Sequence, residues 1–338
     1  MARGSSGRPL TALPKAHLHV HLEAAMRPGT LVEMAAAQGM TVPAIGGYGS
    51  FAAFSGVYEL ATQVLQTEED WARLADEVAV DAAAEGVVYL EPAFWPGRYR
   101  ARFGSDRAIW DMVLELFEQA ATRHGVVLRW MSAIDRVADD PAAAMAVAEL
   151  AAELAPRGVV SFGLHNDEVG HPPTDFVAPF AVAREAGLAA TPHAGELDEG
   201  RHVRDAVLHL GAIRIGHGIR AREVDGLVAE LAERGTCLDV CPTSNLLLGI
   251  VPSLAEHPLG ALLDAGVTCT LNADDPLLFS TTVLGEYEVA RSVLDFDDDR
   301  LATLAANSIR ASAALPAAAM STALAGVEAW LASPVDAV

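Results

Sequence analysis

Three histidines occupy alternate positions in the first apolar segment of the chain. Residues 14 to 23 read "PKAHLHVHLE", in which single apolar residues separate His17, His19 and His21. In a β-strand alternate side chains point to the same face, so the three imidazoles are expected to line up on one side of a buried strand. Several imidazoles in one apolar core are unfavourable unless something binds them, so this stretch indicates a bound group.

Histidine and acidic residues also stand where later apolar segments end, in "HAGE" at 193 to 196, "GHG" at 216 to 218 and "DD" at 274 to 275. Imidazole is a good zinc ligand, and a catalytic zinc ion has several protein ligands and keeps an open position for water. "FGLHNDE", at the end of another such segment, contains no lysine that could be carboxylated to bridge a second metal ion. We therefore predict one zinc ion per chain, bound by His19, His21, His193 and Asp274.

Three further residues near these ligands suit general acid-base chemistry. A bound metal ion lowers the pKa of its water towards ~7. His217 can orient and deprotonate that water, and Glu196 can pass a proton to the substrate. Asp275, next to a predicted ligand, can accept a hydrogen bond from the substrate. Together these residues predict a catalytic site and not a passive metal centre.

The elements that would position these side chains are short apolar segments separated by longer helical patterns. Continuous β-branched runs without alternation are typical of strands buried on both faces of a parallel sheet. Eight strand-helix units indicate an α/β fold, a (β/α)8 TIM-type barrel, whose active sites lie at the mouth where the strands end. The expected strands lie within residues 16–20, 86–92, 125–133, 158–164, 187–193, 212–217, 236–240 and 267–272.

The connection between the first and second expected strands is about twice as long as the ordinary crossover of ~30 residues. We expect extra helices inserted after strand 1. The connection contains Phe51, Phe54 and Tyr58. Long insertions are often lids over an active site, but apolar stripes at helical spacing are mostly core, so the sequence leaves both interpretations open.

Composition limits the partners and the location of the protein. Residues 1–10 are expected to form a disordered tail and residues 11–338 a single barrel domain, and the three cysteines are expected to be reduced and buried. The formal net charge of −22 disfavours nucleic acid and anionic membranes as partners. No apolar run approaches the ~18 to 20 residues of a membrane span, and no signal peptide is evident. We expect a cytoplasmic protein with a small-molecule substrate, and the sequence does not predict its oligomeric state.

These motifs resemble those of the adenosine and adenine deaminases of the metal-dependent amidohydrolase superfamily, and the resemblance covers nearly the whole chain. The matching segments are "HLHVHLE", "HAGE", "RIGHG" and "LNADDP". The resemblance implies a zinc-dependent hydrolytic deaminase of a 6-aminopurine compound, in which water adds at the carbon that bears the exocyclic amine and ammonia leaves. It makes the four predicted ligands the zinc site, with His21 also near the substrate.

The resemblance also assigns the remaining residues. Glu196 is similar to the residue that protonates a purine ring nitrogen, His217 to the histidine that activates water, and Asp275 to the aspartate that binds the other purine ring. His17 stands where the family usually carries glutamate. We expect it one layer deeper in the barrel, in a structural role or in support of the ligands. Ser244 and Asn245 of "CPTSN" are expected to shape the rim of the site by hydrogen bonds.

Departures from the adenosine deaminase pattern concern the substrate. Glu23 and Ala24 stand where those enzymes usually have aspartate and glycine, and Asn166 stands at the glycine that touches the purine. Glu23 and "DEVGHPP" at 167 to 173 are closer to adenine deaminases and to the aminodeoxyfutalosine deaminases of menaquinone biosynthesis. We expect Glu23 and Asn166 to contact the substrate and to alter its selection, although drift in a tolerant pocket would leave the same changes.

Other classes of function account for less of this sequence. A cytidine or tRNA deaminase would show H-x-E followed by P-C-x-x-C, whereas "HAGE" has one more residue and "CPTSN" only one cysteine. Another amidohydrolase with a single metal ion could use the same ligands, but it would leave Glu196, His217 and Asp275 unexplained. A purine-binding protein without catalysis would have no use for this acid-base set.

Overall fold

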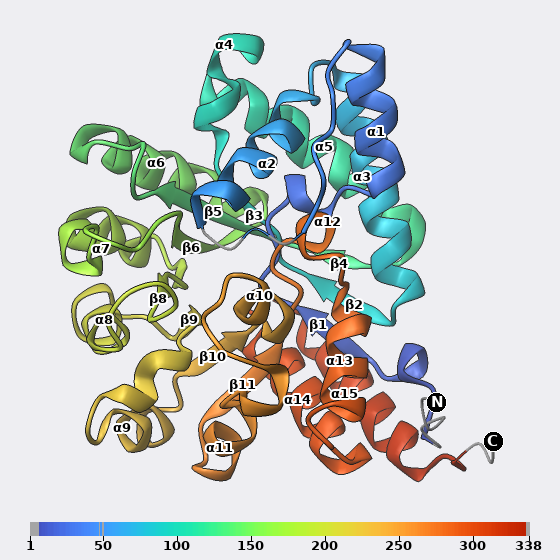
Figure 1. Cartoon of the computed structure of the whole chain (residues 1–338). Coiled ribbons are helices and arrows are strands. Elements are labelled where there is room, and N and C mark those ends of the chain that lie inside the picture. Colours follow the sequence, from blue (N-terminus) through green and yellow to red (C-terminus); the bar gives the residue numbers. More distant parts are fainter. Residues whose placement is uncertain (1–6, 47, 49–50, 336–338) are drawn as a thin grey trace.

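The computed structural model describes residues 7–46, 48 and 51–335 (Figure 1). Its strands are β1 (Lys15–His17), β2 (Val87–Leu90), β3 (Ala93–Phe94), β4 (Val127–Leu128), β5 (Trp130–Asp135), β6 (Val159–His165), β7 (Ala189–Ala190), β8 (His193–Ala194), β9 (Arg214–His217), β10 (Cys237–Val240) and β11 (Thr268–Leu271). Each of the eight expected segments overlaps at least one of these strands.

The helices follow the strands around the molecule. They are α1 (Pro28–Ala37), α2 (Phe51–Gln63), α3 (Glu68–Ala84), α4 (Arg100–Phe103), α5 (Asp106–His124), α6 (Pro141–Leu154), α7 (Val177–Glu185), α8 (Arg201–Asp205), α9 (Leu227–Arg234), α10 (Pro242–Leu247), α11 (Leu259–Asp264), α12 (Pro276–Phe279), α13 (Val283–Ser292), α14 (Asp298–Ala311) and α15 (Ala317–Ala332). In Figure 1 the strands converge on the centre and the larger helices surround them, in chain order around the ring.

All the strand pairs are parallel and form three hydrogen-bonded ladders, β1-β2-β4, β3-β5-β6-β7 and β8-β9-β10-β11. Two strands of the ring are interrupted at Pro92 and Pro192, because proline has no N–H to donate to a ladder. Bridges between Val20 and Asp274 and between His21 and Ala93 link the ladders. The predicted α/β fold of the TIM-barrel type is confirmed, with a ladder that is not continuous around the ring.

Extra helices follow the first strand, as predicted. The connection contains α1, α2 and α3, and Thr67 begins α3 with a capping box in which its side chain accepts from the Asp70 N–H. Phe54 of α2 is buried and stacks on Phe279 of α12, with ring centroids 5.2 Å apart. In Figure 1 α2 lies in front of the central strands. This contact holds α2 against the end of the last barrel unit.

The described part of the chain begins before the predicted boundary at residue 11. Residues 1–6 of the expected disordered tail lie outside the described residues. Arg8, however, pairs with Asp298 of α14 at 2.5 Å, and Leu10 is buried at the start of a short 3-10 helix. Arg8 and Leu10 thus contact the rest of the chain, and the boundary at residue 11 stays a prediction.

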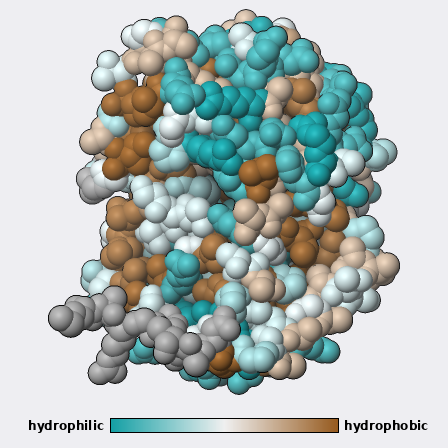
Figure 2. All heavy atoms as spheres, turned by 90° about the vertical axis from the view of Figure 1, so that its right-hand side faces the viewer, coloured by the Kyte–Doolittle hydropathy of each residue, from teal (hydrophilic) through white to brown (hydrophobic). Residues whose placement is uncertain are grey.

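The surface and the core agree with the composition. Cys237, Cys241 and Cys269 are free and buried, as expected. The face that carries α1 and α3 is mostly hydrophilic in its upper part, with hydrophobic side chains in small groups (Figure 2). Within the described residues, every helix is too short or too polar to cross a membrane.

Candidate active site

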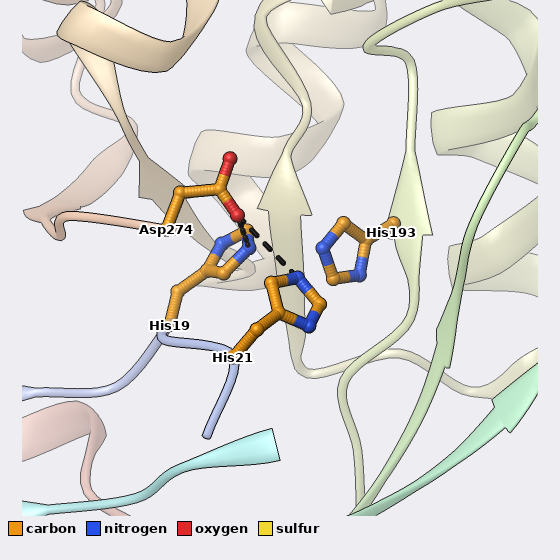
Figure 3. Close-up of side chains that lie close together, drawn as sticks. All are labelled: His19, His21, His193 and Asp274. Carbon is orange, nitrogen blue, oxygen red and sulfur yellow. Dashed lines mark ion pairs between the residues drawn. The ribbon is translucent and has the colours of Figure 1, made fainter. Parts of the chain in front are cut away.

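The structure brings the four predicted metal ligands together at the carboxyl ends of the strands. His19 and His21 follow β1, His193 begins β8 and Asp274 follows β11. Their ligand atoms lie within 4.8 Å of one another. Nε2 of His19 is 3.3 Å and Nε2 of His21 is 3.4 Å from Oδ1 of Asp274, and the His193 ring lies beside them (Figure 3).

His17 does not belong to this group, so the expectation that three histidines share one face was wrong. The N–H groups of Leu18 and His19 both donate to Oδ1 of Asn272, at 2.8 and 3.1 Å, which breaks the regular alternation after β1. His17 lines a separate cavity that α3 also borders. Its Nε2 accepts a hydrogen bond from the Ala273 N–H at 3.1 Å, so it has the expected structural role but not the expected place deeper in the barrel.

The unpaired donor atoms of this group fit a metal ion. Among the described residues, both ring nitrogens of His193 are buried without a hydrogen-bond partner, although buried polar atoms normally have one. Burial and the neighbouring His19 and His217 lower the pKa of His193 well below its usual value, so its ring is neutral and can offer a lone pair. Three imidazoles and one carboxylate are ligand types that zinc takes.

The three predicted acid-base residues lie beside the ligands. Nε2 of His217 is 3.3 Å from Oε2 of Glu196 and 3.7 Å from Oδ2 of Asp274. Burial raises the pKa of Glu196 well above its usual value, and the charges of Asp274 and Glu168 act in the same direction. Burial and Asp274 also raise the pKa of Asp275. The shifts of both carboxyl groups favour the protonated form, which can donate a hydrogen bond or a proton.

Backbone strain coincides with the site. His217, Asp274 and Asn166 have φ angles of 61°, 60° and 77°, in the left-handed region that costs residues other than glycine ~1 to 3 kcal/mol each. Asn166 tolerates this region better than most residues, which explains how it can stand at a position where the resembled family has glycine. Such strain persists only where the surrounding contacts hold the chain in place.

The two residues expected to alter substrate selection both line the cavity, but their side chains are already engaged. Glu23 is buried and accepts hydrogen bonds from the hydroxyls of Tyr58 at 2.9 Å and Tyr99 at 2.8 Å. The amide of Asn166 donates to both carboxylate oxygens of Asp135, at 2.8 and 2.9 Å. The cavity has about 650 Å³ of empty space including its open mouth, within the usual range for small-molecule sites.

Sequence reasoning missed several residues that line this cavity, among them Trp95, Arg98, Asp135 and His165. Asp135 and His165 end β5 and β6, so the rule that found the other site residues could have found them. Arg98 does not lie at the end of a strand, so that rule could not have identified it. Its guanidinium lies between the rings of Tyr58 and Trp95, 5.6 and 5.2 Å from their centroids, and pairs with Glu59.

The expected hydrogen-bonding roles of "CPTSN" are confirmed. The hydroxyl of Ser244 donates to Oδ2 of Asp274 at 2.6 Å, and Nδ2 of Asn245 lies 3.2 Å from Nδ1 of His217. The core interpretation of the aromatic residues of α2 is confirmed for Phe54, and a lid function stays a prediction. Phe54 packs as core and, like Phe51 and Tyr58, also lines the cavity.

The chain is similar to known proteins along nearly its whole length. The chain matches the adenosine deaminase family over residues 14–330. The putative adenosine/adenine deaminase of Streptomyces coelicolor is 40% identical over 339 residues, covering 96% of this chain and 98% of the relative. The aminodeoxyfutalosine deaminase of Streptomyces avermitilis is 39% identical over 313 residues, covering 90% of this chain and 87% of the relative.

Solved structures share the fold along the same length. The adenine deaminase of Arthrobacter aurescens superposes with a TM-score of 0.86 at 31% identity, covering 95% of this chain and all (100%) of that chain. An amidohydrolase of Burkholderia ambifaria, solved with bound zinc, superposes with a TM-score of 0.81 at 28% identity, covering 96% and 91%. Both likenesses extend over nearly the whole of this chain.

Proposed function

The chain belongs to the adenosine deaminase family of hydrolytic deaminases, and from this premise we propose that it is a zinc-dependent deaminase of a 6-aminopurine compound. The proposed reaction joins one water to the ring carbon that bears the exocyclic amine and releases ammonia. An adenosine-like nucleoside would give its inosine-like product. Adenine and aminodeoxyfutalosine are the alternative substrates, since relatives of both kinds match this chain.

The observation that carries the proposal is the position of the buried Glu196 carboxyl beside the ligand group, 3.3 Å from Nε2 of His217. A metal ion alone would suit many hydrolases. A purine ring, in contrast, needs a proton on a ring nitrogen as water adds to the neighbouring carbon. Oε1 of Glu196 is buried without a hydrogen-bond partner among the described residues, so it is available to a substrate.

Each of the site residues has a separate role in the proposed reaction. Zinc held by His19, His21, His193 and Asp274 would supply a water of lowered pKa, about 7. Glu196 donates its proton to the purine ring nitrogen. His217, whose Nε2 is 3.3 Å from Oε2 of Glu196, would orient the attacking water. Asp275 would hydrogen-bond the other purine ring, and aromatic residues of α2 line the same cavity.

A panel of aminopurines tests this function. Zinc-loaded protein would be incubated with adenine, adenosine, deoxyadenosine, methylthioadenosine and aminodeoxyfutalosine, while ultraviolet absorbance and released ammonia are recorded. We expect loss of the adenine chromophore with stoichiometric ammonia from at least one compound. Binding of these compounds without ammonia release would instead indicate a purine-binding protein, and neither binding nor ammonia would indicate an amidohydrolase of another class.

A further inference from the structure

A row of hydrogen-bonded side chains leads from the active site to a histidine that no motif contains. Nδ1 of His217 lies 3.2 Å from Nδ2 of Asn245, and Oδ1 of Asn245 lies 3.2 Å from Nε2 of His257. The Leu259 N–H donates to Nδ1 of His257 at 3.2 Å. The three side chains are 1%, 0% and 6% exposed, so their partners are these groups and not bulk water.

The outer end of the row decides where the proton of His257 lies. A backbone N–H can only donate, so Nδ1 of His257 must accept from Leu259 and carries a lone pair. Burial lowers the pKa of His257 to about 4, and the charge of Arg222 acts in the same direction, so the ring is neutral at pH 7. A neutral imidazole with its lone pair on Nδ1 carries its proton on Nε2.

The proton on Nε2 of His257 determines the orientation of the Asn245 amide, and that orientation determines the tautomer of His217. Nε2–H of His257 donates to Oδ1 of Asn245, which turns the NH2 group of Asn245 towards His217. An amide NH2 group only donates, so Nδ1 of His217 accepts and the neutral His217 ring carries its proton on Nε2. Nε2 is the atom that faces the reaction centre, 3.3 Å from Oε2 of Glu196.

We propose that His257 is a positioning residue that, through Asn245, fixes His217 in the tautomer with Nε2–H directed into the active site. In this state His217 donates a hydrogen bond at the reaction centre and has no lone pair on Nε2 with which to take a proton. Of the two roles expected from the sequence, orienting and deprotonating the water, the structure favours the first. This inference deepens the proposed function. It rests on that function only for the identity of the group that accepts the hydrogen bond from Nε2–H of His217.

Two substitutions of equal size separate the proton pattern from simple packing. In His257→Gln the amide NH2 can replace Nε2–H as a donor to Asn245. In His257→Glu an oxygen stands at that place, so the Asn245 amide turns, offers its oxygen to His217 and moves the proton of His217 to Nδ1. Both variants lose the acceptor for the Leu259 N–H, so that loss is common to the pair.

Nitrogen NMR of the zinc-loaded full-length protein labelled with ¹⁵N-histidine reads the tautomer directly. The His217 signals are assigned by their absence in His217→Asn. We expect a protonated Nε2 and a lone pair on Nδ1 in the wild type and in His257→Gln, and the reverse in His257→Glu. A wild-type proton on Nδ1, or the same pattern in both variants, would overturn the proposal.

Turnover provides the second readout. We expect His257→Glu to lower kcat about 10 to 100-fold, the usual scale for a residue that orients a ligand or catalytic group. We expect His257→Gln to keep most of the wild-type kcat. The zinc content should be unchanged in both variants. Equal kcat in the two variants would contradict a role through the tautomer.

A second variant and the independence of the NMR measurement from substrate keep the proposal testable. If His257→Glu does not fold, Asn245→Asp places a carboxylate oxygen against Nδ1 of His217 and is expected to put a proton there. The NMR measurement needs no substrate. Absence of deamination across the aminopurine panel would therefore refute the proposed function and leave the tautomer result standing.

Discussion

At the scale of single residues, the site depends on which carboxyl groups keep their protons. Asp274 accepts a hydrogen bond from Ser244 and lies among imidazoles, whereas Asp275 and Glu196 are buried next to its charge. Neighbouring acids with different surroundings therefore have pKa values shifted in opposite directions, down for Asp274 and up for Asp275 and Glu196. That separation of pKa values is what assigns the acid and ligand roles.

Glu196→Gln is expected to lower turnover by at least ~100-fold, the scale of a general acid-base group, because glutamine keeps the shape but cannot deliver the proton. Steady-state deamination would be measured alongside zinc content and the midpoint of thermal unfolding, which should stay unchanged. Glu199→Gln, at an exposed neighbouring position, is the control. Near-normal turnover in Glu196→Gln would remove this residue from the mechanism.

The metal site is tested by elemental analysis. We expect one zinc ion per chain in the wild type and none in the double variant His19→Ala, His21→Ala, because two of the four ligands are then missing. The exposed His209, changed to alanine, is the control and should leave the zinc content intact. Two metal ions per chain, or undiminished zinc in the double variant, would contradict the assignment.

Selectivity is expected to follow from Glu23 and Asn166. The carboxylate of Glu23 is fixed by two tyrosine hydroxyls, so it holds a defined place in the cavity, and we expect it to disfavour a plain ribose. The wild type should prefer adenine or a 5′-modified adenosine to adenosine. In Glu23→Asp, Asn166→Gly the ratio of kcat/KM values should shift by about 10 to 200-fold. A wild-type preference for adenosine that the variant leaves unchanged would show that these departures are drift.

At the scale of elements, one carboxylate organises the turn that carries Glu196. Glu168, which follows β6, accepts hydrogen bonds from the N–H groups of Gly195, Glu196, Leu197 and Asp198 at 2.6 to 3.3 Å, and from His202 at 3.2 Å. Arg136, which follows β5, donates to the carbonyl of His193 at 2.6 Å. Opposite charges on two neighbouring loops thus hold both ends of the "HAGE" turn.

Low pH should remove the stability that Glu168 contributes to this turn, over a defined pH range. Burial opposes the charge of Glu168, but His202, Arg136 and the backbone N–H groups lower its pKa from 4.5 to about 2. A depressed folded-state pKa stabilises the protein above the unfolded value and loses that contribution as pH falls through the folded one. The stability that Glu168 adds, on the order of 3 kcal/mol, should therefore be complete near pH 7 and decline from pH 5 to 2.

Urea unfolding of zinc-free wild type and Glu168→Gln at several pH values measures this contribution. We expect the difference in unfolding free energy to shrink as the pH falls through that window. Zinc-free protein is used because acid also releases metal from histidine ligands. A difference that is constant with pH would show that the carboxylate charge does not hold the turn.

At the scale of the whole molecule, a buried ion network joins distant barrel strands beneath the site. Arg214 of β9 pairs with Glu91 at 2.7 Å and with Asp239 of β10 at 3.0 Å, and all three side chains are buried. The carbonyl of Asp239 lies 3.2 Å from Nδ1 of His19. The network therefore connects the packing of the barrel interior to the orientation of a metal ligand.

Arg214→Met should destabilise the protein by about 3 to 5 kcal/mol, because it leaves two buried carboxylates without their partner. We expect a single urea unfolding transition at a lower midpoint, as for one domain. Arg204→Met, which removes a partly exposed pair with Glu230, is the matched control and should cost under about 1 kcal/mol. A loss for Arg214→Met no larger than the control would contradict the importance of the network.

The sequence by itself determined the ring of parallel strands and the cluster of His19, His21, His193 and Asp274. Local patterns reveal buried strands, and parallel barrel strands all end at the same mouth, so polar residues at those ends must meet. Only the tertiary structure decided the position of His17, the pairing of Asn166 with Asp135 and the link from His257 to His217. These depend on strand register and on contacts between distant loops, which spacing along the chain does not encode.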